Sequence, residues 1–489
     1  MPTTATETTA GNETVEGSGI TIQDPRTGEV LWTVPEAGPD AVNHAVSVAR
    51  GEAAGWAATA PAERGAALRA AAKALDAAAK ELAGLNASET GRPENEALAG
   101  IAAGVSTLEQ YAELGPVHRG HSLRGNRLAS DYTLAEPRGV AVLLTPWNDP
   151  VAVACGLIGA ALVTGNTVIH KPSERCPRLG EALGEVLATA FPAGVFQTIS
   201  GGAGVGAALS QADVDVIAHV GSSVSGARIA RAGALTGAHV IRENGGNDPL
   251  LVDRDVDPRW AAEQAAIGAF SNSGQICTAV ERIYVHKDIA AEFCSALEAE
   301  AALRNGNGSV APLVDLRMRD AVHAHIADAL AQGARAVEGG ALPDGPGSFY
   351  PATVLLHCTD GMQVMTEETF GPVAPVQVVD TFDDGLRLAC SGKYGLAATV
   401  LSSNIAHIQQ AVAALPVGTV KVNEVFGGAP GGAAQPRGES GAGFGYGPEL
   451  LDEFSQVKVV HIAAPPAPAP SGSANDPEPV AGSDEQGRP

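Results

Sequence analysis

The sequence predicts an α/β protein made of two α/β domains. Short apolar runs typical of buried strands alternate with Ala-rich stretches of helical periodicity, and this succession is typical of parallel sheets covered by helices. The chain has 489 residues, of which 45% are apolar and 4% aromatic, so large cores of Ala, Val and Leu are expected. This length is compatible with two domains or with about three folding units.

The first expected helix covers residues 62–81, with Leu68, Leu75 and Leu82 at seven-residue spacing. The expected buried strands are residues 139–144, 167–170, 214–220 and 282–286, and a helix over about 258–270 precedes the last of them. Residues 123–137 interrupt this rhythm with alternating polar residues before a strand, which predicts a hairpin that projects from the body.

Composition and charge exclude several classes of protein. Lys and Arg number 31 against 55 Asp and Glu, and the resulting net charge of −24 repels phosphate backbones, so no nucleic-acid partner is expected. The longest apolar candidate, residues 151–163, is too short to span a membrane, and the N-terminus lacks the features of a secretory signal. We therefore expect no membrane association.

The cysteines and histidines favour a reducing cytosol and no metal site. The six cysteines are scattered without a CxxC pair, so the chain is expected to be cytoplasmic. His323 and His325 are two apart on an expected helix and point to different faces, and no Cys/His cluster accompanies them. Residues 1–17 and 463–489 are too polar or Pro-rich to bury surface and are predicted to be disordered tails.

Two motifs directly follow expected strands, at the edge where open α/β sheets bind ligands. The first is TPWNDP (145–150), in which Asn148 offers an amide that either stabilises an oxyanion or bonds its own turn. The second is HKPSE (170–174), in which Lys171, Ser173 and Glu174 are placed to hold sugar hydroxyls. A carboxylate at that place favours an unphosphorylated ribose.

The glycine-rich segments give a weaker signal. GGAGVG (201–206) lacks the acidic residue about 20 positions later that a dinucleotide fingerprint requires. The segment Gly221–Gly226 (GSSVSG) follows a strand and opens a helix, which suits either a pyrophosphate site or an ordinary N-cap.

Three further segments contain reactive side chains. Cys277 lies in the loop SNSGQICT (271–278), where a cysteine is either an accessible nucleophile or an inert buried thiol. Glu243, in RENGGNDP (242–249), is compatible with a general base or a loop carboxylate. The pair Glu367 and Glu368, in EETFGP (367–372), has the same ambiguity.

The identity and order of these segments closely resemble the NAD(P)-dependent aldehyde dehydrogenase superfamily over roughly residues 20–462. The motifs that carry the resemblance are TPWNDP, HKPSE, GGAGVG, VGSSVSG (220–226), RENGGNDP, SNSGQICT, EETFGPVAPV (367–376), YGLAATV (394–400) and KVN (421–423).

The resemblance implies an oxidoreductase that converts an aldehyde to a carboxylic acid through a cysteine thiohemiacetal and thioester. In this pattern Cys277 matches the nucleophile, Glu243 the base that activates the hydrolytic water, and Asn148 the side-chain donor of the oxyanion hole. The cofactor is expected to be NAD, because Glu174 would repel the additional phosphate of NADP.

The resemblance also assigns the coenzyme contacts. Lys171 and Glu174 match the adenosine-ribose binders, Ser222 the pyrophosphate contact, and Glu368 the carboxylate that holds the nicotinamide ribose. The other implied cofactor-binding residues are Trp147, Gly221 and Phe370.

The resemblance further implies two Rossmann-like domains and a small β element for oligomerisation, hence a homodimer or homotetramer. The implied division is a coenzyme-binding domain (18–120 and 138–245), an oligomerisation element (121–137 and 450–462), a catalytic domain (246–425) and a segment that returns to the coenzyme-binding domain (426–449).

Three departures from the family pattern bear on the substrate. Asp149 replaces the usual apolar residue after the oxyanion asparagine, Asn247 stands where lysine is common, and residues 431–443 deviate from the usual loop. Asp149 is either paired or turned to solvent, or it is an anchor for hydroxylated or amino aldehydes. The aldehyde itself does not follow from the sequence.

Two alternatives remain at this stage. A CoA-acylating dehydrogenase would not need Glu243, and a catalytically silent binding protein on the same fold would be expected to have lost Cys277.

Overall fold

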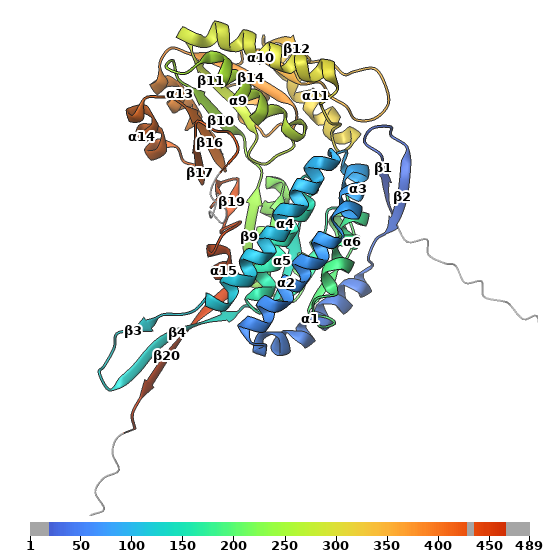
Figure 1. Ribbon diagram of the computed structural model, residues 1–489, viewed down its shortest axis with the longest axis vertical. Helices are drawn as coiled ribbons and strands as arrows, with labels where there is room; N and C mark the ends of the chain where they lie inside the picture. The colour runs from blue at the N-terminus through green and yellow to red at the C-terminus, as the bar shows by residue number, and fades with distance from the viewer. Residues whose placement is uncertain (1–18, 428–434, 466–489) are drawn as a thin grey trace, which may run out of the picture. The chain divides into compact units, whose positions relative to one another are not determined.

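The chain forms the predicted α/β fold, with two open sheets that are each covered by helices on both faces (Figure 1). The computed structural model describes residues 19–427 and 435–465. Both sheets belong to one structural unit, which comprises the described residues up to His118 together with those between Ala135 and Gln456.

The first sheet has six strands in the order β19-β9-β8-β5-β6-β7. Its strands are β5 (Val140–Leu144), β6 (Thr167–Lys171), β7 (Phe196–Thr198), β8 (Val216–Gly221), β9 (His239–Asn244) and β19 (Gly441–Ala442). All neighbours are parallel except β19 and β9. The chain runs outward from β5 to β7 and returns to the other side of β5 with β8, so the strand order switches between β5 and β8. Ligands bind at such a switch point in open α/β sheets.

Alternate residues of β5 enter the two cores of this sheet. Val140, Val142 and Leu144 pack with α1, α7 and α8, whereas Ala141 and Leu143 pack with α2 to α6. Figure 1 shows α2, α4 and α5 side by side over this second face. The helices are α1 (Pro39–Ala58), α2 (Pro61–Ala77), α3 (Ala79–Thr90), α4 (Glu94–Leu114), α5 (Pro150–Val163), α6 (Pro177–Ala188), α7 (Ala203–Gln211) and α8 (Ser223–Thr236).

The single helix predicted over residues 62–81 is wrong, because the structure divides it into α2 and α3 at Ala78. Ala78 leaves the helical region (φ −92°, ψ 0°), although its N–H still donates to the carbonyls of Ala74 and Leu75. Leu68, Leu75 and Leu82 are all buried, so the heptad spacing correctly marked the core face on both sides of the break. Neither Gly nor Pro marks the break in the sequence.

The second sheet has seven strands in the order β12-β13-β14-β11-β10-β16-β17. They are β10 (Asp248–Val252), β11 (Val280–His286), β12 (Arg335–Glu338), β13 (Thr353–Leu356), β14 (Val373–Val379), β16 (Ala397–Leu401) and β17 (Thr419–Val422). Only the β12–β13 pair is antiparallel.

Alternation along β10 again separates two cores. Leu250 and Val252 pack with α9 and α10, and Leu251 packs with α11, α13 and α14. The helices are α9 (Pro258–Phe270), α10 (Lys287–Asn307), α11 (Leu316–Ala331), α12 (Gln363–Thr366), α13 (Phe382–Ala389) and α14 (Ile405–Ala414). The observed bounds of α9 match the predicted helix over residues 258–270.

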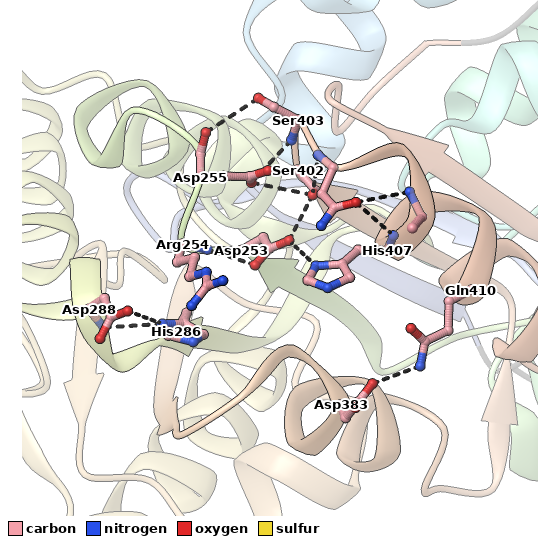
Figure 2. A network of polar contacts seen from close by, with 12 residues as sticks. Asp253, Arg254, Asp255, His286, Asp288, Asp383, Ser402, Ser403, His407 and Gln410 are labelled. Atoms are coloured by element: carbon pink, nitrogen blue, oxygen red, sulfur yellow. Dashed lines mark hydrogen bonds and ion pairs between the residues drawn. The ribbon is translucent and has the colours of Figure 1, made fainter.

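A closed polar network covers the carboxyl end of the seven-stranded sheet, as Figure 2 shows. Asp253, the residue after β10, accepts hydrogen bonds from the Ser402 hydroxyl (2.8 Å) and the Arg254 N–H (2.8 Å) and contacts the His407 Nδ1 (2.6 Å). The His407 ring also stacks on Phe382, with centroids 4.3 Å apart. The polar groups at this edge therefore satisfy one another.

The remaining elements are small. They are the hairpin β1 (Gly19–Gln23) and β2 (Val30–Pro35), the pair β15 (Tyr394–Gly395) and β18 (Arg437–Gly438), the short helix α15 (Glu449–Glu453) and the 3-10 turns η1 (Gly115–Val117) and η2 (Ser271–Gly274). Among the described residues, no helix is both long and apolar enough to cross a membrane.

A second unit comprises the described residues of 119–134 and 457–465. Its three-stranded sheet is formed by β3 (Ser122–Leu123), β4 (Ala129–Pro137) and β20 (Ser455–Ala463), and β3 pairs antiparallel with β4. The interruption at residues 123–137 is therefore a hairpin, as predicted. The predicted tail 1–17 and most of the tail 463–489 lie outside the described residues.

Candidate active site

The carboxyl edge of the six-stranded sheet positions most of the predicted site residues. Asn148 lies in the turn between β5 and α5, Lys171 ends β6, and Gly221 ends β8. Glu243 lies near the end of β9, where it is in register with Val220 of β8 and Gly441 of β19. Parallel pairing thus brings four separate motifs to one edge.

Cys277 comes from the opposite sheet, in the loop between α9 and β11. Earlier in this loop, the consecutive residues Asn272, Ser273 and Gly274 have positive φ angles of 46°, 54° and 73°. A side chain at Gly274 would collide with the carbonyl oxygen of Gly371, so only glycine fits there. The two non-glycine residues cost about 1–3 kcal/mol each, a strain typical of functional loops.

A hydrogen bond joins Asn148 to this loop. Its Nδ2 donates to the carbonyl oxygen of Gln275 at 3.1 Å, and the Asn272 Nδ2 donates to the same oxygen at 3.3 Å. An Asn side chain has two N–H donors, so the second N–H of Asn148 is free to serve a substrate oxygen. Gln275 is two positions before Cys277 in the sequence, so this hydrogen bond brings the predicted oxyanion donor to the Cys277 loop.

Glu243 is one of three carboxylates whose charges raise the pKa of Cys277. Burial raises the pKa of Glu243 to about 7. Its carboxylate lies beside Gly445, in the loop that follows β19. A carboxyl group with this pKa is suited to take a proton from water near neutral pH.

The Cys277 thiol lies in an acidic environment. Burial raises its pKa, and the nearby charges of Glu243, Asp248 and Glu368 raise it further, whereas Lys421 lowers it. The thiolate is the nucleophilic form of cysteine. Formation of the thiolate at this position therefore depends on the balance between three carboxylates and one ammonium group.

Lys171 and Glu174 form a pair at the end of β6. The buried Lys171 Nζ donates to the carbonyl oxygen of Pro172 (2.9 Å) and lies 3.8 Å from the carboxylate of Glu174. The Glu174 side chain is 43% exposed, so its carboxylate remains open to a ligand. Burial lowers the pKa of Lys171, while Glu174 opposes that effect.

Ser222 is the N-cap of α8. Its hydroxyl oxygen accepts the N–H of Ser225 at 3.3 Å, which shows that it caps the helix. The same helix start lies at the switch point beside β5, where the helix dipole favours a bound phosphate. Gly221 directly precedes it.

Glu368, Phe370 and Trp147 lie at the junction of the two sheets. Glu368 is folded against Gly245 and accepts the N–H of Gly246 at 3.2 Å, and burial, followed by the charge of Glu281, raises its pKa. Phe370 has a positive φ of 52° and meets the Trp147 ring edge-to-face, with centroids 5.7 Å apart. The two predicted ribose carboxylates thus differ, since Glu174 is open and Glu368 is enclosed.

Comparisons with known proteins agree with this geometry. Residues 13–460 match the model of the aldehyde dehydrogenase family. A betaine aldehyde dehydrogenase of Cereibacter sphaeroides is 35% identical over 473 residues, 93% of this chain and 96% of the relative. The chain belongs to the aldehyde dehydrogenase family.

Solved structures of other aldehyde dehydrogenases and similar proteins have the same fold. An NADP-dependent enzyme of E. coli matches with a TM-score of 0.88 and 30% identity, covering 92% of this chain and 96% of that one. PnpE, solved in complex with nicotinamide adenine dinucleotide, matches with a TM-score of 0.88 and 28% identity, covering 92% and 95%. This aldehyde dehydrogenase is an oxidoreductase that oxidises an aldehyde to a carboxylic acid with a nicotinamide cofactor.

The sequence did not indicate the partner of Asp149. Arg92, which lies between α3 and α4, contacts the Asp149 carboxylate at 2.9 Å and donates to the carbonyl oxygen of Asn148 at 3.0 Å. Of the two interpretations of Asp149, the structure therefore supports the paired one. No spacing rule links positions 92 and 149, so only the fold could show this contact.

Sequence reasoning also missed Lys421 and Asp248, which influence Cys277, and Tyr446, which lies beside Gly156 of α5. Lys421 and Asp248 both influence the pKa of Cys277. The Tyr446 hydroxyl donates to the carbonyl oxygen of Ala152 (3.2 Å), and burial raises its pKa, with smaller contributions from Glu243 and Asp149. Lys421 lies in the KVN motif and Asp248 in RENGGNDP. Both residues were therefore within motifs that the sequence singled out, but their effect on Cys277 was not predicted.

Proposed function

We propose that this aldehyde dehydrogenase works through Cys277 as nucleophile, Asn148 as oxyanion donor and Glu243 as the base for hydrolysis. The observation that carries the proposal is the hydrogen bond from Asn148, beside the six-stranded sheet, to the loop that holds Cys277 beside the seven-stranded sheet. Glu243 supports the proposal, because its charge, after burial, contributes to raising the pKa of the Cys277 thiol. All three groups have the chemistry that their roles require.

The first half of the reaction forms a thioester. The Cys277 thiolate attacks the aldehyde carbon, and the carbonyl oxygen becomes an alkoxide that accepts hydrogen bonds from the free N–H of Asn148 and a backbone N–H. Removal of one such donor typically costs about 10²–10³ in rate. A bound nicotinamide cofactor supplies the hydride acceptor for the oxidation. Cys277 then holds the acyl group as a thioester.

The second half releases the acid. Glu243 takes a proton from water, the resulting hydroxide attacks the thioester carbon, and the bond to Cys277 breaks to regenerate the thiolate. A pKa of about 7 lets the carboxylate accept this proton near neutral pH and then return it to solvent. A carboxylate base at this place favours hydrolysis over transfer of the acyl group to CoA.

We propose NAD rather than NADP as the cofactor. Lys171 and Glu174 would hold the adenosine ribose, Ser222 and Gly221 the pyrophosphate, and Glu368, Phe370 and Trp147 the nicotinamide side. The fit rests on the open carboxylate of Glu174 at the end of β6 and on the start of α8 at the switch point. Two unit charges 4 Å apart interact by about 4 kcal/mol at an effective dielectric of about 20, and solvent reduces this for an exposed group.

We propose that Asp149 is not a charged anchor for the aldehyde, because Arg92 already neutralises it. The relatives named betaine aldehyde dehydrogenases make betaine aldehyde a suitable member of a substrate panel. An apolar aldehyde and a hydroxylated aldehyde complete the comparison.

We also propose that β4 and β20 mediate assembly into homodimers or homotetramers. Val457 and Val459 of β20 are 72% and 66% exposed, and Leu134 of β4 is 41% exposed. Exposed apolar side chains along strands are typical of contact surfaces. Light scattering after gel filtration measures the expected assembly, and Val457→Lys with Val459→Lys should weaken it.

Rapid mixing of enzyme, aldehyde and NAD tests the catalytic proposal. Cys277→Ala should give no NADH, whereas Glu243→Gln should give a burst of one NADH for each site, followed by turnover that is slower by about 10²–10⁴. Cys294→Ala is the matched control, since Cys294 is also a half-buried free thiol, and it should keep full activity. Full turnover of Cys277→Ala would refute the proposal. Recovery of Glu243→Gln on addition of CoA would instead indicate acyl transfer.

A further inference from the structure

Lys421 projects from β17 towards the loop that carries the nucleophile. Its Nζ donates to the carbonyl oxygen of Val425 at 2.6 Å and lies 3.5 Å from the carbonyl oxygen of Thr278, the residue after Cys277. The same ammonium lies 5.4 Å from the ring centroid of Phe426. The charge of Lys421 is thus held against the Cys277 loop by two carbonyls and one aromatic face.

Asp248 is the first residue of β10. Its side chain is 4% exposed, and its Oδ1 accepts the N–H of Ala397 at 3.2 Å. Its Oδ2 is buried and accepts no hydrogen bond from any residue that the structure describes. A side chain at Gly246 would collide with the Asp248 carboxylate and crowd the carbonyl oxygen of Cys277, so both groups lie close to this glycine.

A buried carboxylate oxygen without a donor requires a nearby positive charge or a proton. Arg282 is the other cation close to Asp248, but its Nε and Nη1 already donate to the carbonyls of Asn247 and Ser391, both at 2.8 Å. Lys421 is the remaining cation that acts on both Asp248 and Cys277. Burial raises the pKa of Asp248 to about 8, so this carboxyl group becomes negative only above that pH, where Lys421 offsets its effect on the sulfur.

The charged groups that act on Cys277 or on Asp248 come from four strands and the segment before β14. They are Glu243 of β9, Asp248 of β10, Glu281 and Arg282 of β11, Glu368 before β14, and Lys421 of β17. Three of these carboxylates oppose ionisation of Cys277, while Lys421 favours it. Burial lowers the pKa of Lys421, and the negative charges of Asp248 and Cys277 oppose that effect.

We propose that Lys421 is a positioning residue for the nucleophile. Its ammonium, balanced by the Asp248 carboxylate, fixes the Thr278 and Val425 carbonyls and supplies the positive charge beside which the Cys277 thiolate forms. The inference rests on the proposed role of Cys277. It adds a charge pair, Lys421 and Asp248, whose two members act on the sulfur in opposite directions.

Alkylation of Cys277 by iodoacetamide, followed by mass spectrometry of the peptide that contains it, tests the proposal on the full chain. The rate follows the thiolate fraction, so its midpoint with pH reports the ionisation of the thiol. Lys421→Met should raise this midpoint by about one pH unit and slow alkylation near neutral pH about ten-fold. Lys421→Arg keeps the charge and should remain close to wild type. Cys294 in the same samples is the internal control.

Asp248→Asn separates a charge effect from a loss of structure. This variant removes the negative member of the pair, so the midpoint of Cys277 should fall, and the double variant with Lys421→Met should return towards wild type. Damage to the loop alone would shift the alkylation midpoint of Cys277 in the same direction in both single variants. Asp248→Asn also keeps the test decisive if Lys421→Met does not fold.

An unchanged midpoint in Lys421→Met, or a midpoint in Asp248→Asn that does not fall, would overturn the proposal. Neither result bears on the catalytic assignment, because alkylation requires no aldehyde and no cofactor. Conversely, if Cys277→Ala retained dehydrogenase activity, the proposed function would fail whatever the alkylation data showed.

Discussion

The carboxyl edges of the two sheets carry polar groups of opposite character. At the six-stranded sheet, the Glu174 carboxylate and the second N–H of Asn148 remain available to a ligand, and Glu243 is half-buried with a raised pKa. At the seven-stranded sheet, the residues after β10 and β16 are closed into the network of Figure 2. The first edge leaves polar groups available to a ligand, whereas the polar groups of the second edge bond to one another.

This difference refines the rule that open α/β sheets bind ligands at their carboxyl ends. The rule holds for the six-stranded sheet. The seven-stranded sheet instead contributes residues from its amino edge, since Cys277 precedes β11, Glu368 precedes β14 and Asp248 begins β10. Its carboxyl edge needs no polar groups for a ligand, so hydrogen bonds can pair the polar groups there.

The two edges also shift the pKa of a carboxyl group in opposite directions. Burial raises the pKa of Glu243 to about 7. Burial alone would also raise the pKa of Asp253, but hydrogen bonds from His407, Ser402 and the Arg254 N–H outweigh it and lower the pKa below the usual value. A carboxylate with full partners is a structural group, and one without partners is a candidate for chemistry.

The largest expected effect concerns pH at the open edge. In the proposed mechanism hydrolysis needs the deprotonated form of Glu243, and below a pKa of about 7 this form decreases about ten-fold per pH unit. The rate of acid release in single-turnover experiments should therefore fall about 50-fold between about pH 7 and about pH 5. Glu243→Gln should show a low rate without this dependence. A flat profile in the wild type would contradict the role of Glu243.

The closed edge should affect stability and leave catalysis unchanged. Asp253 is 1% exposed, so Asp253→Ala leaves its buried donors unpaired and should lower the free energy of unfolding by about 1–3 kcal/mol in urea denaturation. The kcat/KM of the folded enzyme should stay within about two-fold of wild type, as expected for a site remote from the chemistry. Asp383→Ala, which removes an exposed bond to Gln410, is the matched control and should cost at most about 1 kcal/mol.

The Asp253 effect should also depend on pH. Because the pKa of Asp253 is lower in the folded protein than its usual 3.8, its contribution to stability is complete above that pH and is lost as the pH falls through the folded value. The difference between wild type and Asp253→Ala should therefore shrink in strongly acidic solution. A large loss of kcat/KM in this variant would show that the closed edge communicates with the site.

The fold and most of the candidate site could be predicted from the sequence because their signals are local. The strands and α9 follow from short apolar runs and their boundaries, and Asn148, Lys171 and Glu174 follow directly from strand ends. The break at Ala78 could not be predicted, since an Ala-rich segment has uniform helical propensity on both sides.

The contacts across the sheets were beyond sequence reasoning for a different reason. Arg92 meets Asp149, and Lys421 meets the Cys277 loop, although the partners are separated by tens of residues or more and share no periodicity. Electrostatic effects at Cys277 and Glu243 likewise depend on burial, which only the packed structure defines. The motifs identified the reactive groups, but the charges that tune them come from the fold.

A smaller effect is expected for the cofactor at the open edge. Glu174→Gln removes the charge that opposes the additional phosphate of NADP, so the ratio of kcat/KM for NAD to that for NADP should fall about ten-fold. Glu185→Gln on α6 is the matched control, because Glu185 is exposed on the helix that follows. Steady-state kinetics with both cofactors measure the ratio. A wild type that uses NADP as well as NAD would contradict the proposed preference.

The smallest effect is expected at Asp149. It lies at the carboxyl edge of the six-stranded sheet, but its carboxylate is already paired with Arg92. Arg92 binds both the Asp149 carboxylate and the Asn148 carbonyl, so the pair resembles the network around Asp253 more than the open groups beside it. Asp149→Asn should therefore lower kcat/KM for betaine aldehyde and for a neutral aldehyde by similar factors of about two to five, through slight displacement of Asn148. Arg92→Met should do the same, and the double variant should be no worse than either single variant, because both changes break one contact. A selective loss of about ten-fold or more for the cationic aldehyde would show that Asp149 faces the substrate, and the open character of this edge would then extend to the aldehyde site.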